Sequence, residues 1–237
     1  MRPSGLTFAG ATSYRLPDGK EPGDMIGKRA RSSLMAAMIS ALAVTSAPAS
    51  GHPHAWIDIS VDILFDASGK VTGLRQSWLF DEFYTADTVR AEERNKLGAL
   101  IDRVLKNLEE WGYFTRVRLG ERAIGLAIPT ERSARLEKNR LRLNFVTPLT
   151  EAAAPVGAAL TYAIYDPTFF IEMLHDERKN AIRLIGAPPR CAARRIAPTP
   201  SSATIASAAA LDRSQTGDDS LGAEFAEKVE IRCDARS

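Results

Sequence analysis

The chain has 237 residues, with 31 Lys and Arg residues against 29 Asp and Glu residues and a net charge of +2 at pH 7. Six of the basic but only three of the acidic residues precede residue 50, which leaves 25 basic against 26 acidic side chains beyond it. Because this remainder has no basic excess, the composition excludes a binder of nucleic acid that relies on electrostatic attraction. Its length suits one domain with a hydrophobic core.

Residues 25–49 have the pattern of a secretory signal peptide. A basic segment at 28–31 precedes an apolar segment at 34–44, and Ala-Pro-Ala at 47–49 is typical of a cleavage site. The apolar segment is shorter than the roughly 20 residues that a transmembrane helix needs. The pattern therefore predicts export, with no membrane span once the signal is removed.

This interpretation divides the chain into three parts. Residues 1–24 precede the signal without being apolar, and we expect them to be an upstream extension of the gene model. Residues 25–49 are the expected signal, with cleavage near 49–51. Residues 50–237 are the expected single exported domain, which the family resemblance described below places in the periplasm.

The first elements of this domain are predicted to be two strands and a helix. Apolar side chains alternate with polar ones over 57–63, and a turn at 66–70 leads to a returning segment at 71–80, which together indicate a β-hairpin. Between Thr85 and Trp111, apolar residues recur at helical spacing, and Gly112 follows as a stop signal.

The rest of the domain reads mainly as short strands. A stretch rich in Ala, Ser, Thr and Pro, residues 197–220, interrupts them and predicts a flexible loop. The pattern favours a mainly β (α+β) fold, a β-sandwich-like domain with one long helical insertion and a C-terminal disulfide loop. The further predicted strands are 114–119, 123–128, 141–146, 160–165 and 225–232, with weaker candidates at 169–174 and 182–185.

Cys191 and Cys233 are the two cysteines of the chain. In an oxidising compartment they are expected to form a disulfide. Zinc ligation is the alternative, but the chain has no CxxC spacing to favour it.

His52 and His54 are the main candidate metal ligands, because neutral imidazole is the commonest protein ligand of zinc, copper and nickel. Cleavage after Ala49 would leave an amine, two ionisable amides and the His52 imidazole, a set that suits square-planar copper(II) or nickel(II). Cleavage after Gly51 would leave His52 at the terminus, where amine and imidazoles suit zinc. The alternative to metal binding is a frayed polar terminus.

His175 and Asp166 are weaker candidates for the same metal. His175 lies where an apolar segment meets a charged turn, so it is either a solvated turn residue or a third ligand. Asp166 precedes Pro167 and either braces a turn or lines a site. Asp58 lies about 13 Å along a strand from His54 and is expected to make a structural contact. Asp81 is expected to cap the following helix.

The aromatic residues are read mostly as core. No HExxH, GxSxG or glycine-rich phosphate loop occurs, so the sequence favours a protein that is not an enzyme and has no organic cofactor. The aromatic residues assigned to the core are Trp56, Trp78, Tyr84, Tyr165, Phe169 and Phe170.

Several segments resemble one bacterial periplasmic family of unknown function. The opening His-Pro-His-Ala-Trp-Ile-Asp, residues 52–58, resembles its HPHxWID motif, and the resemblance continues in order along the domain. Members are often labelled ABC transporter substrate-binding proteins and are commonly encoded beside nickel/cobalt/zinc permeases. The later matching segments are 80–84, 165–170, 186–191 and 222–228 before Cys233.

The resemblance and the histidine pair together predict a periplasmic accessory protein that binds zinc, nickel, cobalt or copper and hands it to an inner-membrane permease. One alternative is a docking subunit of the permease that holds no metal. Another is a metal-dependent periplasmic hydrolase, which would need Asp58, Asp81, Asp166 and His175 around one cleft.

Overall fold

The computed structural model describes residues 52–89, 96–177, 180–211 and 215–234. They belong to one compact unit, Pro48–Ser237. The upstream extension and the signal peptide predicted for residues 1–49 lie outside the described residues. Among the described residues, no helix is long and apolar enough to cross a membrane.

The larger sheet has the strand order β5-β6-β2-β1-β8, and β9 also pairs with β1. β1 and β2 form the predicted antiparallel hairpin, with Ile59 opposite Trp78. β8 and β9 both run parallel to β1 and pair with successive halves of it. The strands of this sheet are β1 Ala55–Phe65, β2 Val71–Phe80, β5 Thr130–Glu137, β6 Arg140–Ala153, β8 Ile171–His175 and β9 Ile182–Ile185.

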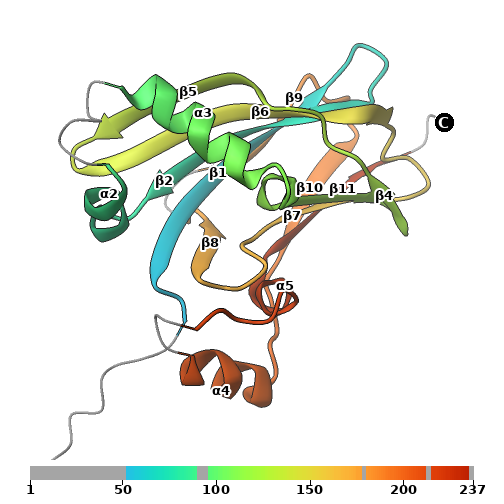
Figure 1. The fold of residues 1–237 in the computed structure, drawn as a ribbon. Helices are drawn as coiled ribbons and strands as arrows, with labels where there is room; N and C mark the ends of the chain where they lie inside the picture. The colour runs from blue at the N-terminus through green and yellow to red at the C-terminus, as the bar shows by residue number, and fades with distance from the viewer. Residues whose placement is uncertain (1–51, 90–95, 178–179, 212–214, 235–237) are drawn as a thin grey trace, which may run out of the picture. The chain divides into compact units, whose positions relative to one another are not determined.

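The second sheet has the order β10-β11-β7-β3-β4. Its neighbouring strands are antiparallel throughout (Figure 1). The mainly β, two-sheet fold class is therefore confirmed. The strands of this sheet are β3 Thr115–Leu119, β4 Arg122–Ile124, β7 Leu160–Ile164, β10 Cys191–Ile196 and β11 Lys228–Cys233.

The helical region after β2 contains α2, Glu82–Thr88, and α3, Leu97–Leu108. The single helical segment predicted from Thr85 to Trp111 therefore corresponds to the end of α2 and to α3, and it started too late and ended too late. Asp81 starts α2 one turn before Thr85, and the chain after α3 continues into a 3₁₀ turn, Gly112–Phe114.

The segment predicted to be a flexible loop, 197–220, contains the helix α4, Ser202–Ala210. Alanine has the highest helix propensity, and the Ser201 side chain accepts a hydrogen bond from the Thr204 backbone N–H as an N-cap. Composition alone therefore gave the wrong structure for this part of the segment. A short helix, α5 Leu221–Phe225, follows before β11.

The core lies on one face of the larger sheet. Ile57, Ile59, Val61 and Ile63 point into it because side chains alternate between the faces of a strand. Helix α3 packs against the same core, and the second sheet adds residues from β7 and β11 (Figure 1). The opposite face of β1 carries Trp56, whose side chain is 48% exposed, so assigning it to the core was wrong.

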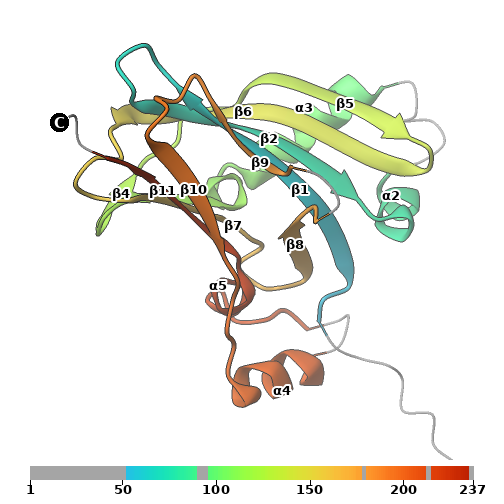
Figure 2. The ribbon, with the colours of Figure 1, turned by 180° about the vertical axis from the view of Figure 1, so that it is seen from behind.

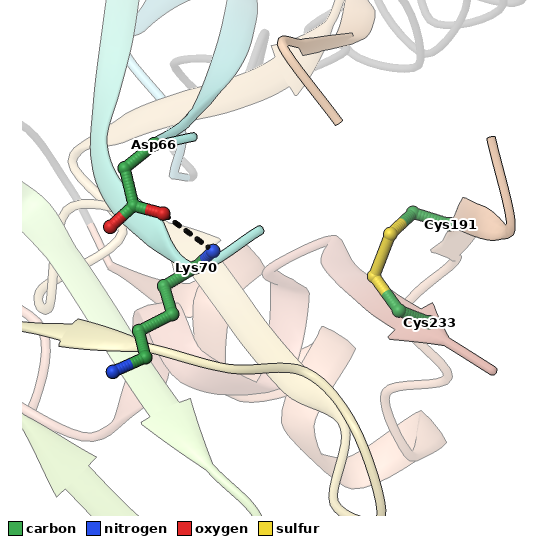
Figure 3. The surroundings of a disulfide bond; sticks show 4 residues. All are labelled: Asp66, Lys70, Cys191 and Cys233. Carbon is green, nitrogen blue, oxygen red and sulfur yellow. Dashed lines mark hydrogen bonds between the residues drawn. A yellow bond between two sulfur atoms is a disulfide. The ribbon is translucent and has the colours of Figure 1, made fainter. Parts of the chain in front are cut away.

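Cys191 and Cys233 form the predicted disulfide, at one end of the β10–β11 pair (Figure 3). The two residues face each other in the antiparallel register and are 42 positions apart in the chain. The bond closes a loop that includes α4 and α5. Figure 3 also shows the β1–β2 turn, where the Lys70 backbone N–H donates to Asp66 Oδ1 at 3.0 Å.

Candidate metal centre

His52 and His54 lie side by side just before β1. Their ring centroids are 4.7 Å apart in an edge-to-face arrangement. Phe170 packs against both rings, at 5.6 Å from His52 and 5.2 Å from His54. The His52 residue is 8% exposed, so the pair does not form a frayed polar terminus.

Two backbone hydrogen bonds fix this segment. The His52 N–H donates to the Ala208 carbonyl of α4 at 3.0 Å, and the His54 N–H donates to the Phe170 carbonyl at 2.9 Å. The peptide bond between His52 and Pro53 is cis. The histidine backbone is thus attached to α4 on one side and to the start of β8 on the other.

The His54 ring has a nitrogen available for a ligand. Its Nε2 atom is buried and has no hydrogen-bond partner among the described residues. A buried polar atom without a partner costs free energy, about 1–3 kcal/mol, so such an atom calls for a physical explanation. A metal ion between the two rings would give this nitrogen a partner.

The described residues contain no group of three or more His, Cys, Asp or Glu side chains that could hold a metal. Within this part of the chain, the two histidines are brought together, and neither His175 nor Asp166 joins them. Zinc sites use at least three protein ligands. The remaining ligands would have to come from water, from a second protein or from residues outside the described part of the chain.

His175 ends β8 and is 2% exposed, which corrects its interpretation as a solvated turn residue. The parallel register places it beside Ile59, on the inner face of the sheet. Its Nδ1 atom lies 2.8 Å from Glu227 Oε2, and its Nε2 atom lies 2.9 Å from the Tyr162 hydroxyl. Both ring nitrogens are therefore occupied by protein groups.

Glu227 is the acidic member of this buried group. Burial raises the pKa of its carboxyl, but hydrogen bonds from His175 and the nearby charge of Arg195 lower it more, so the net pKa lies below the ordinary value. Arg195 Nη1 is 3.3 Å from Glu227 Oε1. The carboxylate is therefore ionised at neutral pH and orients the imidazole.

The three aspartates singled out in the sequence have structural partners. Asp166 Oδ1 accepts from the Thr168 N–H and its Oδ2 from the Ile171 N–H, both at 3.0 Å, so Asp166 braces the turn before β8. Asp81 caps α2 by accepting from the Tyr84 N–H at 2.8 Å, as predicted. Asp58 is paired with Arg140 at 2.8 Å.

Sequence reasoning missed Tyr162 and Glu227. Tyr162 lies within β7 and Glu227 directly precedes β11, each at a position where the alternation of the strand points the side chain inward. In the sequence such positions look like ordinary core positions. The one sequence signal at Glu227 was its place in the family-like segment 222–228, which assigns no role to it.

The fold and the histidine pair define a two-sheet, disulfide-bonded β-protein with a candidate metal centre at its first strand. The chain belongs to the family described as "Protein of unknown function (DUF1007)", whose model matches residues 37–233.

Two relatives are similar to this chain. An uncharacterized protein of Haemophilus influenzae is 27% identical over 190 residues, which cover 77% of this chain and 91% of the relative. An uncharacterized 15.5 kDa protein from the region 3′ of trpE in Spirochaeta aurantia is 34% identical over 74 residues. That match covers 30% of this chain and 50% of the relative.

Proposed function

We propose that this protein binds a divalent metal ion (zinc, nickel, cobalt or copper) through His52 and His54 and delivers it to an inner-membrane permease from the periplasm. The observation that carries the proposal is the pair of imidazoles, 4.7 Å apart between ring centroids, with a buried His54 Nε2 that has no hydrogen-bond partner among the described residues. The Cys191–Cys233 disulfide supports an oxidising compartment.

The backbone around the pair favours one of the two ligand sets considered above. A square-planar copper or nickel site would use the His52 amide nitrogen as a ligand, and that N–H donates to the Ala208 carbonyl at 3.0 Å. Square-planar binding would break this bond and detach the segment from α4. We therefore favour coordination through the two imidazoles and a terminal amine, with water completing the site, which suits zinc or cobalt.

The test is metal titration of the protein exported with its own signal and purified without chelator. We expect one zinc or cobalt ion per chain in the wild type and a loss of at least a hundredfold in affinity in the His52→Ala/His54→Ala double variant. Native mass spectrometry of the same sample reports the N-terminus and the bound metal. Equal affinity in the double variant and the wild type would refute the proposal.

The third histidine supplies the matched control. His175→Gln removes an imidazole from the chain but leaves the pair intact, so its metal affinity should equal that of the wild type. Because this variant changes a buried group, circular dichroism must first show that it is folded. A loss of metal affinity in folded His175→Gln would instead assign the metal to His175.

A second candidate function is metal-independent docking on the permease. Trp56 and Phe83 favour it, because their residues are 48% and 88% exposed and line one hollow of about 480 Å³ together with Arg140. Exposed aromatic side chains near an arginine are typical of protein interfaces. Trp56→Ser/Phe83→Ser should then abolish co-purification with the permease without changing metal affinity, and unchanged co-purification would remove this candidate.

A hydrolase has less support. Each of the four residues expected to form its cleft has a structural role of its own. Asp81 caps a helix, Asp166 braces a turn, Asp58 pairs with an arginine and His175 is enclosed by Tyr162 and Glu227.

A further inference from the structure

The outer face of the larger sheet carries a row of small polar side chains. Ser60 on β1 pairs with Ser77 on β2, Ser77 with Asn144 on β6, and Asn144 with Ser133 on β5. The four residues therefore lie at one level across four neighbouring strands. Figure 2 shows these strands in front of α3, so the helix covers the opposite face.

Arginines border this row. Asp62 accepts two hydrogen bonds from Arg183, at 2.7 and 2.9 Å. Arg75 lies 3.8 Å from the same carboxylate and donates to Glu131 Oε2 at 3.2 Å. The Asp62 side chain is 11% exposed, whereas those of Arg75 and Arg183 are 43% and 56% exposed. The shielded Asp62 carboxylate thus positions Arg183, and Arg75 lies between Asp62 and Glu131; both guanidinium groups remain accessible to solvent.

A third guanidinium lies across the row. Arg135 on β5 donates to Glu137 at 2.8 Å and keeps 59% of its side chain exposed. Ion pairs between exposed side chains contribute little to stability, so an anionic ligand can compete for the Arg135 guanidinium. Each of the three arginines has an acidic neighbour, and each keeps 43% or more of its side chain exposed to solvent.

These groups line one hollow of about 580 Å³, within the usual range for small-molecule sites. Its charged lining consists of three arginines and one aspartate, a net charge of +2. Serine hydroxyls and asparagine amides form its floor, and both can hydrogen-bond to carboxylate or phosphate oxygens. The hollow thus combines positive charge with oxygen-binding donors.

We propose that this hollow binds a small anion with at least two oxyanion groups, either carboxylates or phosphates. Arg75 and Arg183 would bind one oxyanion group and Arg135 another, across the row of hydroxyls. Guanidinium groups suit this ligand class because their fork of N–H donors matches two oxygens of a carboxylate or phosphate. A long nucleic acid is disfavoured because the chain beyond residue 49 has no basic excess.

The test uses citrate and pyrophosphate as probes, with acetate as the singly charged control. Both probes chelate divalent metals, so the titrations are made in the His52→Ala/His54→Ala background without metal. This keeps the result independent of the proposed metal function. We expect calorimetry to detect saturable binding of citrate, pyrophosphate or both, and at least tenfold weaker binding of acetate.

Arg75→Gln and Arg183→Gln should each weaken binding at least tenfold. Arg194→Gln on β10, which removes an exposed arginine from the other sheet, should leave binding unchanged. Binding of citrate alone would assign the site to polycarboxylates, and binding of pyrophosphate alone would assign it to phosphate compounds. Absence of saturable binding at millimolar probe, or equal binding by the arginine variants in their folded state, would overturn the proposal.

Discussion

Glu227 Oε2 accepts two hydrogen bonds from a single residue, His175: one from its backbone N–H and one from its ring Nδ1, each at 2.8 Å. His175 ends β8 in the larger sheet, and Glu227 directly precedes β11 in the second sheet. Tyr162 on β7 reaches the other ring nitrogen. The imidazole is therefore bound from both sides by residues of the second sheet, and it joins the two sheets through polar contacts inside the core.

The first prediction concerns the charge of this buried group. Glu227→Gln should lower the free energy of unfolding at neutral pH by about 2 kcal/mol, because two charge-assisted hydrogen bonds are weakened. Urea unfolding at about pH 7 measures the change. Glu224→Gln, at an exposed position three residues earlier, should change the free energy by less than about 0.5 kcal/mol.

The same carboxyl predicts a pH dependence. Its pKa in the folded protein lies below the ordinary value of 4.5, so its contribution to stability is complete above that value and declines as the pH falls through the lowered pKa. The stability difference between wild type and Glu227→Gln should therefore shrink in acid. A difference that stays constant from neutral pH down to about pH 3 would contradict this assignment.

A buried glutamine gives the second prediction. Gln76 Nε2 donates to Thr115 Oγ1 and Thr147 Oγ1 at 3.1 and 2.8 Å, and its Oε1 accepts from Trp78 Nε1 at 3.0 Å. Gln76→Leu leaves the buried indole N–H without its acceptor and should cost about 2–3 kcal/mol. Chemical denaturation measures this cost.

A double-variant cycle tests the physical reason for that cost. Trp78→Phe removes the indole N–H, so Gln76→Leu should cost less in the Trp78→Phe background than in the wild type. Strictly additive costs would show that the indole hydrogen bond does not stabilise the core.

The third prediction compares two glycines. A Cβ atom on Gly222 would lie 1.8 Å from the Asp166 carbonyl oxygen, so Gly222→Ala should displace α5 from the turn before β8 and cost more than about 3 kcal/mol. A Cβ atom on Gly98 in α3 would meet nothing within 4 Å. Gly98→Ala should therefore stabilise the protein by about 0.5–1 kcal/mol, through its higher helix propensity. Thermal melts should show a lower melting temperature for Gly222→Ala and a higher one for Gly98→Ala than for the wild type.

The fourth prediction concerns the disulfide. Cys191→Ala/Cys233→Ala should lower the free energy of unfolding by about 2–5 kcal/mol, because the bond restricts the unfolded chain. Wild-type protein in reductant should melt near the temperature of the double variant. Reductant should leave the melting temperature of the double variant unchanged. A shift in that variant would show that reductant affects stability otherwise than by breaking the disulfide.

The sequence predicted the parts of the fold where local signals agree. The β1–β2 hairpin has strict alternation, and Asp81 is followed by an amphipathic helical segment. β5 and β10 were missed because TERSARLE has few apolar side chains and CAARRI shows no regular alternation of apolar with polar ones. Their hydrogen bonds to β6 and β11, not their own side chains, decide their conformation.

The candidate site could be predicted only in part. The proximity of His52 and His54 in the sequence suggested their proximity in space, but the contacts with Phe170 and Ala208 depend on distant segments. His175 was misplaced for the same reason. A charged run follows it, and only its pairing beside Ile59 places the ring in the core.

The parallel pairing of β1 with β8 and β9 has a consequence for the order of folding. One edge of β1 can be covered early, because β2, β5 and β6 follow it in the chain before β8 and β9 do. The other edge stays unpaired until residues 171–185 have been synthesised, because no earlier described strand pairs there. A partly synthesised chain therefore presents an open strand edge, the feature through which unfinished proteins associate with one another. Truncation before Ile171 should yield a protein that aggregates, although most of the larger sheet is present.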